Sequence, residues 1–119
     1  MSCLFISCGK HLQVDPRKLR SQVVKVIREL PHLLISDQPL SWWISQTGQQ
    51  IEEYADSMNL SSTCGTAIEI AIIAILYRRT IQIVQGGKVT AEFFPEFGDP
   101  FQLIFSGPAT NGHFEPGQK

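Results

Sequence analysis

The stretch that most constrains this sequence is Ala67 to Tyr77, which is apolar on nearly every side and carries one charged residue, Glu69. Its length and its alanines favour an α-helix, although its isoleucines also suit a strand. The stretch is far shorter than the roughly 20 residues that a membrane-spanning helix needs. It therefore predicts a helix buried in the core of a globular domain, with Arg78 and Arg79 at its carboxyl end.

Directly after this helix the hydrophobic pattern changes to a period of two. Residues 80–84 and 88–93 alternate on either side of Gly86-Gly87 and predict a β-hairpin. Residues 101–105 predict a further strand, and a turn then leads to a last strand at or near His113. Helices first and an antiparallel sheet after them predict an α+β domain.

The first half of the chain carries the helical signals. Asp15-Pro16 predicts a helix start, with an acceptor at the N-cap and proline at the first helical position, and apolar residues recur at helical spacing until Pro31. A second helical region, after Pro39, is divided into two pieces by Gly48. Its paired tryptophans are expected to anchor the core. The basic residues of the first helix are expected to form a solvated face rather than a phosphate-binding groove; they are Arg17, Lys18, Arg20, Lys25 and Arg28.

Length, charge and cysteine content limit the classes of function. The 119 residues suffice for one domain with a single core. A net charge of −1 argues against broad electrostatic binding to nucleic acid or to an anionic membrane, and no signal peptide is recognisable. Three cysteines without a CxxC pair argue against a disulfide-stapled secreted fold or a zinc ribbon. They fit a reducing, cytoplasmic location.

The residues with the most chemical potential stand near the two ends of the chain. Cys3 opens a short apolar run that Gly9 is expected to stop. If this run is helical, the unpaired N–H groups of its first turn favour a thiolate at Cys3. At the other end a strand would place Glu115 on the same side as His113, so that the carboxylate can fix the histidine tautomer. Together these are the thiolate, imidazole and orienting polar group that a cysteine hydrolase needs.

Other interpretations use the same residues. Taken alone, Cys3 also fits a half-buried terminal residue without chemistry. Metal or redox chemistry would draw on Cys3, Cys8 and Cys64, but the spacing of the first two suits no standard zinc site. Cys8 is more simply a small buried hydrophobe. His11 and His32 are expected to be surface residues.

Several stretches resemble the ovarian tumour (OTU) family of papain-like cysteine proteases, in the family's order and along essentially the whole chain. Ser2-Cys3-Leu4-Phe5 resembles its Asn-Cys-Leu-Phe core, and Gly112-His113-Phe114-Glu115 resembles its Gly-His-Tyr-Asp. Cys64-Gly65-Thr66-Ala67-Ile68-Glu69-Ile70 is similar to its Trp-Gly-Gly-x-x-Glu-Leu segment. The resemblance implies a single OTU-like domain over residues 1–119, with a small antiparallel-rich sheet packed between helices.

The resemblance also implies a cysteine-dependent deubiquitinase, which hydrolyses the bond formed by the carboxyl-terminal glycine of ubiquitin. By position, Cys3 would attack the carbonyl carbon, His113 would shuttle the proton and Glu115 would orient His113. A narrow channel for the glycines of the substrate would be lined by Asn111, Gly112 and Gly65. The family needs no metal or cofactor; the expected partners are ubiquitin or ubiquitinated proteins, and the chain is expected to be a monomer.

The sequence departs from the family pattern around its nucleophile. The family normally has an Asp-Gly-Asn run before the cysteine, and the aspartate helps to build the oxyanion hole; here Met1-Ser2 precede Cys3. The leader before the nucleophile is thus expected to be missing or very short. Losing one oxyanion-hole contribution typically lowers kcat by about 10²–10³. The alternative is therefore a catalytically weak or inactive OTU-like module that binds ubiquitin or another partner.

Overall fold

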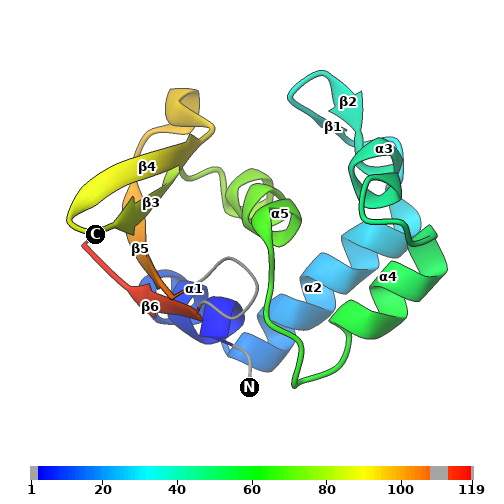
Figure 1. Ribbon diagram of the computed structural model, residues 1–119, viewed down its shortest axis with the longest axis horizontal. Coiled ribbons are helices and arrows are strands. Elements are labelled where there is room, and N and C mark those ends of the chain that lie inside the picture. Colours follow the sequence, from blue (N-terminus) through cyan, green and yellow to red (C-terminus); the bar gives the residue numbers. More distant parts are fainter. Residues whose placement is uncertain (1–2, 108–112, 119) are drawn as a thin grey trace.

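Helix α5 (Ala67–Tyr77) crosses the middle of the computed structural model, between a β-sheet on one side and helices α2, α3 and α4 on the other (Figure 1). The structure describes residues 3–107 and 113–118, without the side chain of residue 3. Residues 70–74 of α5 are all buried, which confirms the predicted core helix. None of the helices in the described ranges is long and apolar enough to cross a membrane.

The other helices follow the predicted pattern. They are α1 (Cys3–Leu12), α2 (Pro16–Glu29), α3 (Leu40–Ser45) and α4 (Ile51–Met58). Asp15 caps α2, since its carboxylate accepts the backbone N–H of Arg17 at 2.8 Å. Gly48, with a φ of 84°, lies in the turn that separates α3 from α4. The cap and the break were both predicted from the sequence.

The sheet contains four strands in the order β4-β3-β5-β6. They are β3 (Ile81–Gln85), β4 (Lys88–Phe93), β5 (Phe101–Ser106) and β6 (His113–Pro116). The predicted hairpin and the two later strands are confirmed, but the central pair, β3 and β5, is parallel. The antiparallel expectation was therefore wrong for this pair. The chain returns along β4, passes through the 3₁₀ helix η1 (Pro95–Phe97) and enters β5 at the end where β3 also begins.

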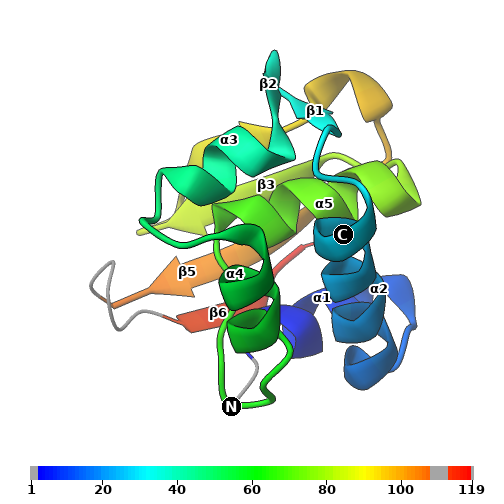
Figure 2. The ribbon, with the colours of Figure 1, turned by 90° about the vertical axis from the view of Figure 1, so that its right-hand side faces the viewer.

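A small hairpin lies where the sequence predicted only a break. Its strands are β1 (Leu34–Ile35) and β2 (Gln38–Pro39), and Figure 2 shows it beside α3. Ser36 and Asp37 form its turn with positive φ values of 50° and 70°. Trp43 is partly buried and packs against the core, as expected, and its indole N–H donates to the carbonyl oxygen of Ile35 at 2.8 Å. Trp42, by contrast, is 40% exposed.

Helix α1 differs from the prediction at two residues. It continues through Gly9 rather than stopping there. A Cβ at this position would lie 2.5 Å from the carbonyl oxygen of Val14, so glycine lets the following loop fold back onto the helix. His11, expected on the surface, is buried, and its ring stacks on Phe101 with centroids 4.6 Å apart. Both corrections come from tertiary contacts that the local pattern does not contain.

A buried carboxylate organises the amino end of α5. Glu69 is completely buried and accepts the hydroxyl of Tyr54 at 2.7 Å, the backbone N–H of Thr66 at 2.7 Å and the Thr66 hydroxyl at 2.6 Å. Thr66 is also the N-cap of α5, so the two residues form a capping box. Burial raises the pKa of Glu69, whereas the hydrogen bonds from Thr66 and Tyr54 act in the opposite direction.

A second buried polar residue corrects the expectation of a wholly solvated basic face on α2. Arg20 is buried and donates to the carbonyl oxygens of Met58 and Thr63. Its guanidinium carbon also lies 4.4 Å from the centre of the Phe5 ring. Arg20 thus joins α2 to α1 and to the loop that follows α4.

The contacts of Glu69 predict a specific effect of Tyr54→Phe. The substitution removes one donor from a buried carboxylate, and we expect the free energy of unfolding to fall by about 1–3 kcal/mol, measured by urea denaturation. Tyr77→Phe is the matched control, because its hydroxyl donates to Gln22 at a partly buried position. The control should lose about 0.5–1.5 kcal/mol, as for an ordinary hydrogen bond. Equal losses in the two variants would contradict a special role for the Glu69 carboxylate.

Candidate active site

The start of α1 and the start of β6 lie at the same edge of the domain (Figure 1). Helix α1 begins at Cys3, and β6 begins at His113. The buried hydroxyl of Ser7 donates to the carbonyl oxygen of Phe114 at 3.1 Å. Ser7 comes one helical turn after Cys3, and Phe114 is the neighbour of His113, so this bond places the two predicted site positions near each other.

A second contact fixes the direction of the helix along the strand. One turn beyond Ser7, the Nε2 of His11 donates to the carbonyl oxygen of Gln102 at 2.9 Å. That same oxygen accepts the backbone N–H of Gly117, which follows β6, at 2.8 Å. Since Ser7 reaches the first half of β6 and His11 reaches its far end, α1 and β6 run in the same direction. The amino end of the helix therefore faces the beginning of the strand.

The side chains of His113 and Glu115 lie on the same side of β6, as strand geometry predicted. The Nε2 of His113 is 3.2 Å from the Oε2 of Glu115. An ionised carboxylate only accepts hydrogen bonds, so Nε2 carries the proton in this pair and Nδ1 is the basic nitrogen of the neutral ring. Both side chains are more than half exposed, at 56% and 57%. The imidazole is therefore held by Glu115 and also open to solvent.

Of the two cysteines in α1, the structure describes the side chain of Cys8 but not that of Cys3. Cys8 is completely buried, and burial raises the pKa of its thiol to about 12. Cys8 is thus the small core hydrophobe that the sequence predicted, and it stays protonated at neutral pH.

The remaining predicted site residues are described only in part. Asn111, Gly112 and the side chain of Cys3 lie outside the described residues. Gly65 is buried, and a Cβ at this position would collide with the side chain of Leu4, the residue after Cys3. Glycine at this position therefore lets the segment before α5 lie directly against the first turn of α1.

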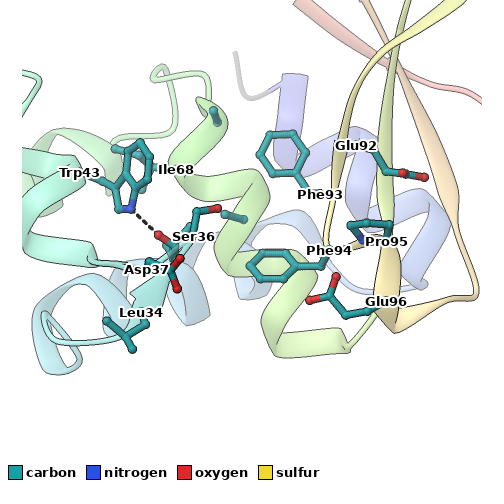
Figure 3. A pocket seen from close by; sticks show the side chains of 13 residues that line it. Leu34, Ser36, Asp37, Trp43, Ile68, Glu92, Phe93, Phe94, Pro95 and Glu96 are labelled. Carbon is teal, nitrogen blue, oxygen red and sulfur yellow. Dashed lines mark hydrogen bonds between the residues drawn. The ribbon is translucent and has the colours of Figure 1, made fainter.

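A cavity of about 550 Å³, which the sequence did not predict, lies between the β1–β2 hairpin, α3, α5 and the end of β4 (Figure 3). Aromatic side chains and three carboxylates line the cavity. The aromatic residues labelled in Figure 3 are Trp43, Phe93 and Phe94, and the acidic ones are Asp37, Glu92 and Glu96. Of the predicted site residues, the three that the structure describes in full, Gly65, His113 and Glu115, do not line this cavity. Within residues 3–107 and 113–118, no group of three or more histidine, cysteine, aspartate or glutamate side chains is placed to hold a metal ion.

Comparison with solved structures identifies the fold. An OTU domain determined in complex with ubiquitin matches with a TM-score of 0.73 and 25% sequence identity, over 97% of this chain and 62% of that chain. The OTU domain of OTUD1 matches with a TM-score of 0.65 and 17% identity, over 96% and 77% of the two chains. No protein-family model and no curated protein sequence matches the chain. The predicted OTU resemblance is confirmed at the level of the fold, and the chain spans less than two thirds of the first of these structures.

The contact between Gly65 and Leu4 predicts a compensating pair of substitutions. Gly65→Ala adds a methyl group against Leu4 and should lower the free energy of unfolding by about 1–3 kcal/mol. Leu4→Ala alone should lower it by about 2–5 kcal/mol, because Leu4 is completely buried. In the double variant the shortened side chain leaves room for the added methyl group, so the combined loss should be smaller than the sum. Strictly additive losses in urea denaturation would show that the two residues do not interact.

Proposed function

We propose that this chain is a cysteine-dependent deubiquitinase, which hydrolyses the isopeptide or peptide bond after the carboxyl-terminal glycine of ubiquitin. The observation that carries the proposal is the hydrogen bond from Ser7 to Phe114, because it holds the helix start at Cys3 beside the strand start at His113. The OTU fold supports ubiquitin as the partner, since one of the similar structures is an OTU domain in complex with ubiquitin.

In the proposed reaction, the Nδ1 of His113 takes the proton of the Cys3 thiol, and the thiolate attacks the carbonyl carbon of the terminal glycine. His113 then donates this proton to the departing lysine amine, which leaves ubiquitin bound to Cys3 as a thioester. Water hydrolyses the thioester, with His113 acting as the base. Glu115 accepts the Nε2–H of His113 and keeps the ring in the tautomer that this sequence of steps requires.

The start of α1 supplies the electrostatic part of this proposal. Its first N–H groups have no partner within the helix and point toward the position of Cys3. They favour the thiolate in the resting enzyme and a developing oxyanion in the transition state. The packing of Gly65 on Leu4 brings a second backbone segment to this edge, where it can border the channel for the glycines of the substrate.

A ubiquitin that carries an electrophile at its carboxyl terminus tests the nucleophile. We expect the purified, reduced chain to form a covalent adduct, which mass spectrometry would locate at Cys3. Cys3→Ala should abolish the adduct, whereas Cys8→Ala should keep it, because Cys8 is buried with a raised pKa. A correctly folded sample without any adduct would sink the enzyme hypothesis. Saturable binding of ubiquitin by such a sample would instead favour the interaction module.

Turnover of a ubiquitin substrate tests the other two residues. His113→Ala should lower kcat by about 10²–10⁴, the usual contribution of a general acid–base. Glu115→Ala should lower kcat by less and leave KM nearly unchanged, because Glu115 acts through His113. Glu92→Ala is the matched control, since this exposed carboxylate lies on β4, where it accepts a hydrogen bond from the side chain of Gln82. If Glu115→Ala and Glu92→Ala had the same kcat, Glu115 would have no role in orienting His113.

A further inference from the structure

Helix α5 contributes its smallest side chains to the cavity of Figure 3. Ala67, Ile68 and Ala71 line the cavity, and the two alanines lie about one helical turn apart, so that they share one side of the helix. Their methyl groups leave space between α3 and the end of β4 unfilled. The resulting volume of about 550 Å³ lies within the range of ligand-binding pockets.

The side walls of the cavity carry aromatic rings. Figure 3 shows Trp43 on one side and Phe93 and Phe94 on the other. All three are partly buried, so each keeps part of its ring surface accessible to a ligand. The hydrogen bond from Trp43 to Ile35 holds the indole, and the ring of Phe94 stacks on Phe97 with centroids 5.0 Å apart. The aromatic walls are therefore held by contacts within the protein.

The charges around these rings are all negative. Asp37 lies in the turn of the β1–β2 hairpin and Glu96 lies in η1, on opposite sides of the cavity (Figure 3). Both are exposed, and neither has a hydrogen bond or an ion pair to another side chain in the described part of the chain. Glu92 already accepts a hydrogen bond from Gln82. Among the lining residues that the structure describes, none is basic, so two carboxylates are left for a ligand.

Aromatic rings beside carboxylates suit a ligand that is both flat and cationic. The guanidinium group of arginine stacks on aromatic faces, donates two parallel hydrogen bonds to one carboxylate and is hydrated more weakly than an ammonium group. The chain itself contains three such stacks, in which the guanidinium carbons of Arg20, Arg78 and Arg79 lie 4.4, 4.8 and 4.9 Å from the centres of phenylalanine rings. An anionic ligand would be repelled by the carboxylates, and an apolar one would cover them without donating a hydrogen bond.

We propose that this cavity binds an arginine-containing peptide segment of a partner protein. The arginine side chain enters between Trp43 and Phe94, and its guanidinium group pairs with Asp37 or Glu96. An apolar residue next to this arginine covers Leu34, which lines the cavity and is 64% exposed. The proposed catalytic residues take no part, so the peptide site goes beyond the proposed function and does not depend on it.

An NMR titration of the ¹⁵N-labelled full chain tests the site. The probe is the synthetic peptide acetyl-Ala-Leu-Arg-Leu-Ala-amide, and its control carries citrulline in place of arginine, which keeps the shape and removes the charge. We expect saturable shifts of the indole N–H of Trp43 and the backbone N–H groups of Ser36 and Phe93. The citrulline peptide should bind at least about tenfold more weakly, because its uncharged group forms weaker hydrogen bonds to a carboxylate.

Two outcomes of this titration would overturn the proposal. One is equal affinity for the two peptides, or no saturable shift with either. The other is that ubiquitin shifts the same signals while the arginine peptide does not, because the cavity would then belong to a surface for a folded protein.

Substitutions separate the charge of the cavity from its shape. The double variant Asp37→Asn, Glu96→Gln should bind the arginine peptide about tenfold more weakly, since one exposed charge pair contributes up to about fivefold. Ala67→Leu should weaken binding at least as much without any change of charge, because the larger side chain fills the cavity. Glu29→Gln is the matched control, an exposed carboxylate at the end of α2 that does not line the cavity.

The control should bind the peptide like the wild type. If the double variant or Ala67→Leu bound as tightly as the control, the proposal would be overturned. All of these substitutions lie at exposed positions, and the NMR spectrum of each variant reports whether it is folded. A chain that binds the peptide but forms no adduct with the ubiquitin electrophile keeps the peptide site and loses the deubiquitinase function. The reverse result keeps the function and rejects the site.

Discussion

The buried carboxylate of Glu69 is the interaction on which the arrangement of this domain depends. A carboxylate without partners in the protein interior would cost several kcal/mol, so its oxygens must be satisfied by donors. Tyr54 supplies one from α4, and Thr66 supplies two at the amino end of α5. The same group therefore caps the central helix, ties it to α4 and fixes the segment that leads into it.

From this network, a short series of contacts leads to the candidate site. Thr66 is held by Glu69, its neighbour Gly65 packs on Leu4, and Leu4 follows Cys3. One turn further along α1, Ser7 holds β6 through its hydrogen bond to the backbone beside His113. The exposed pair of His113 and Glu115 can therefore be oriented although it has little packing of its own, because buried contacts fix the elements that carry it.

The sequence predicted those parts of the fold that have a local cause. The α5 helix, the Asp15 cap and the hairpin around Gly86-Gly87 all follow from periodicity or turn chemistry. The parallel pairing of β3 with β5 could not be predicted, because strand order leaves no mark in the pattern of a single strand. The β1–β2 hairpin was missed since its turn, Ser36-Asp37, contains no glycine, and the burial of Arg20 depends on carbonyl groups that come much later in the chain.

The candidate site was predicted from residue chemistry and from the order of the motifs along the chain. This prediction worked best where two residues interact within one strand, as His113 and Glu115 do. It worked least well at residues of the Cys64–Thr66 segment that differ from the OTU pattern, because the pattern does not show what the different side chains contact. Thr66 stands where the family has a glycine, yet its hydroxyl accepts the N–H of Ile68 and donates to Glu69, which glycine cannot do. Cys64 stands where the family has a tryptophan, and its side chain is partly buried against the core. The departure at Thr66 therefore adds hydrogen bonds at the start of α5, while Gly65 beside it keeps the close packing on Leu4.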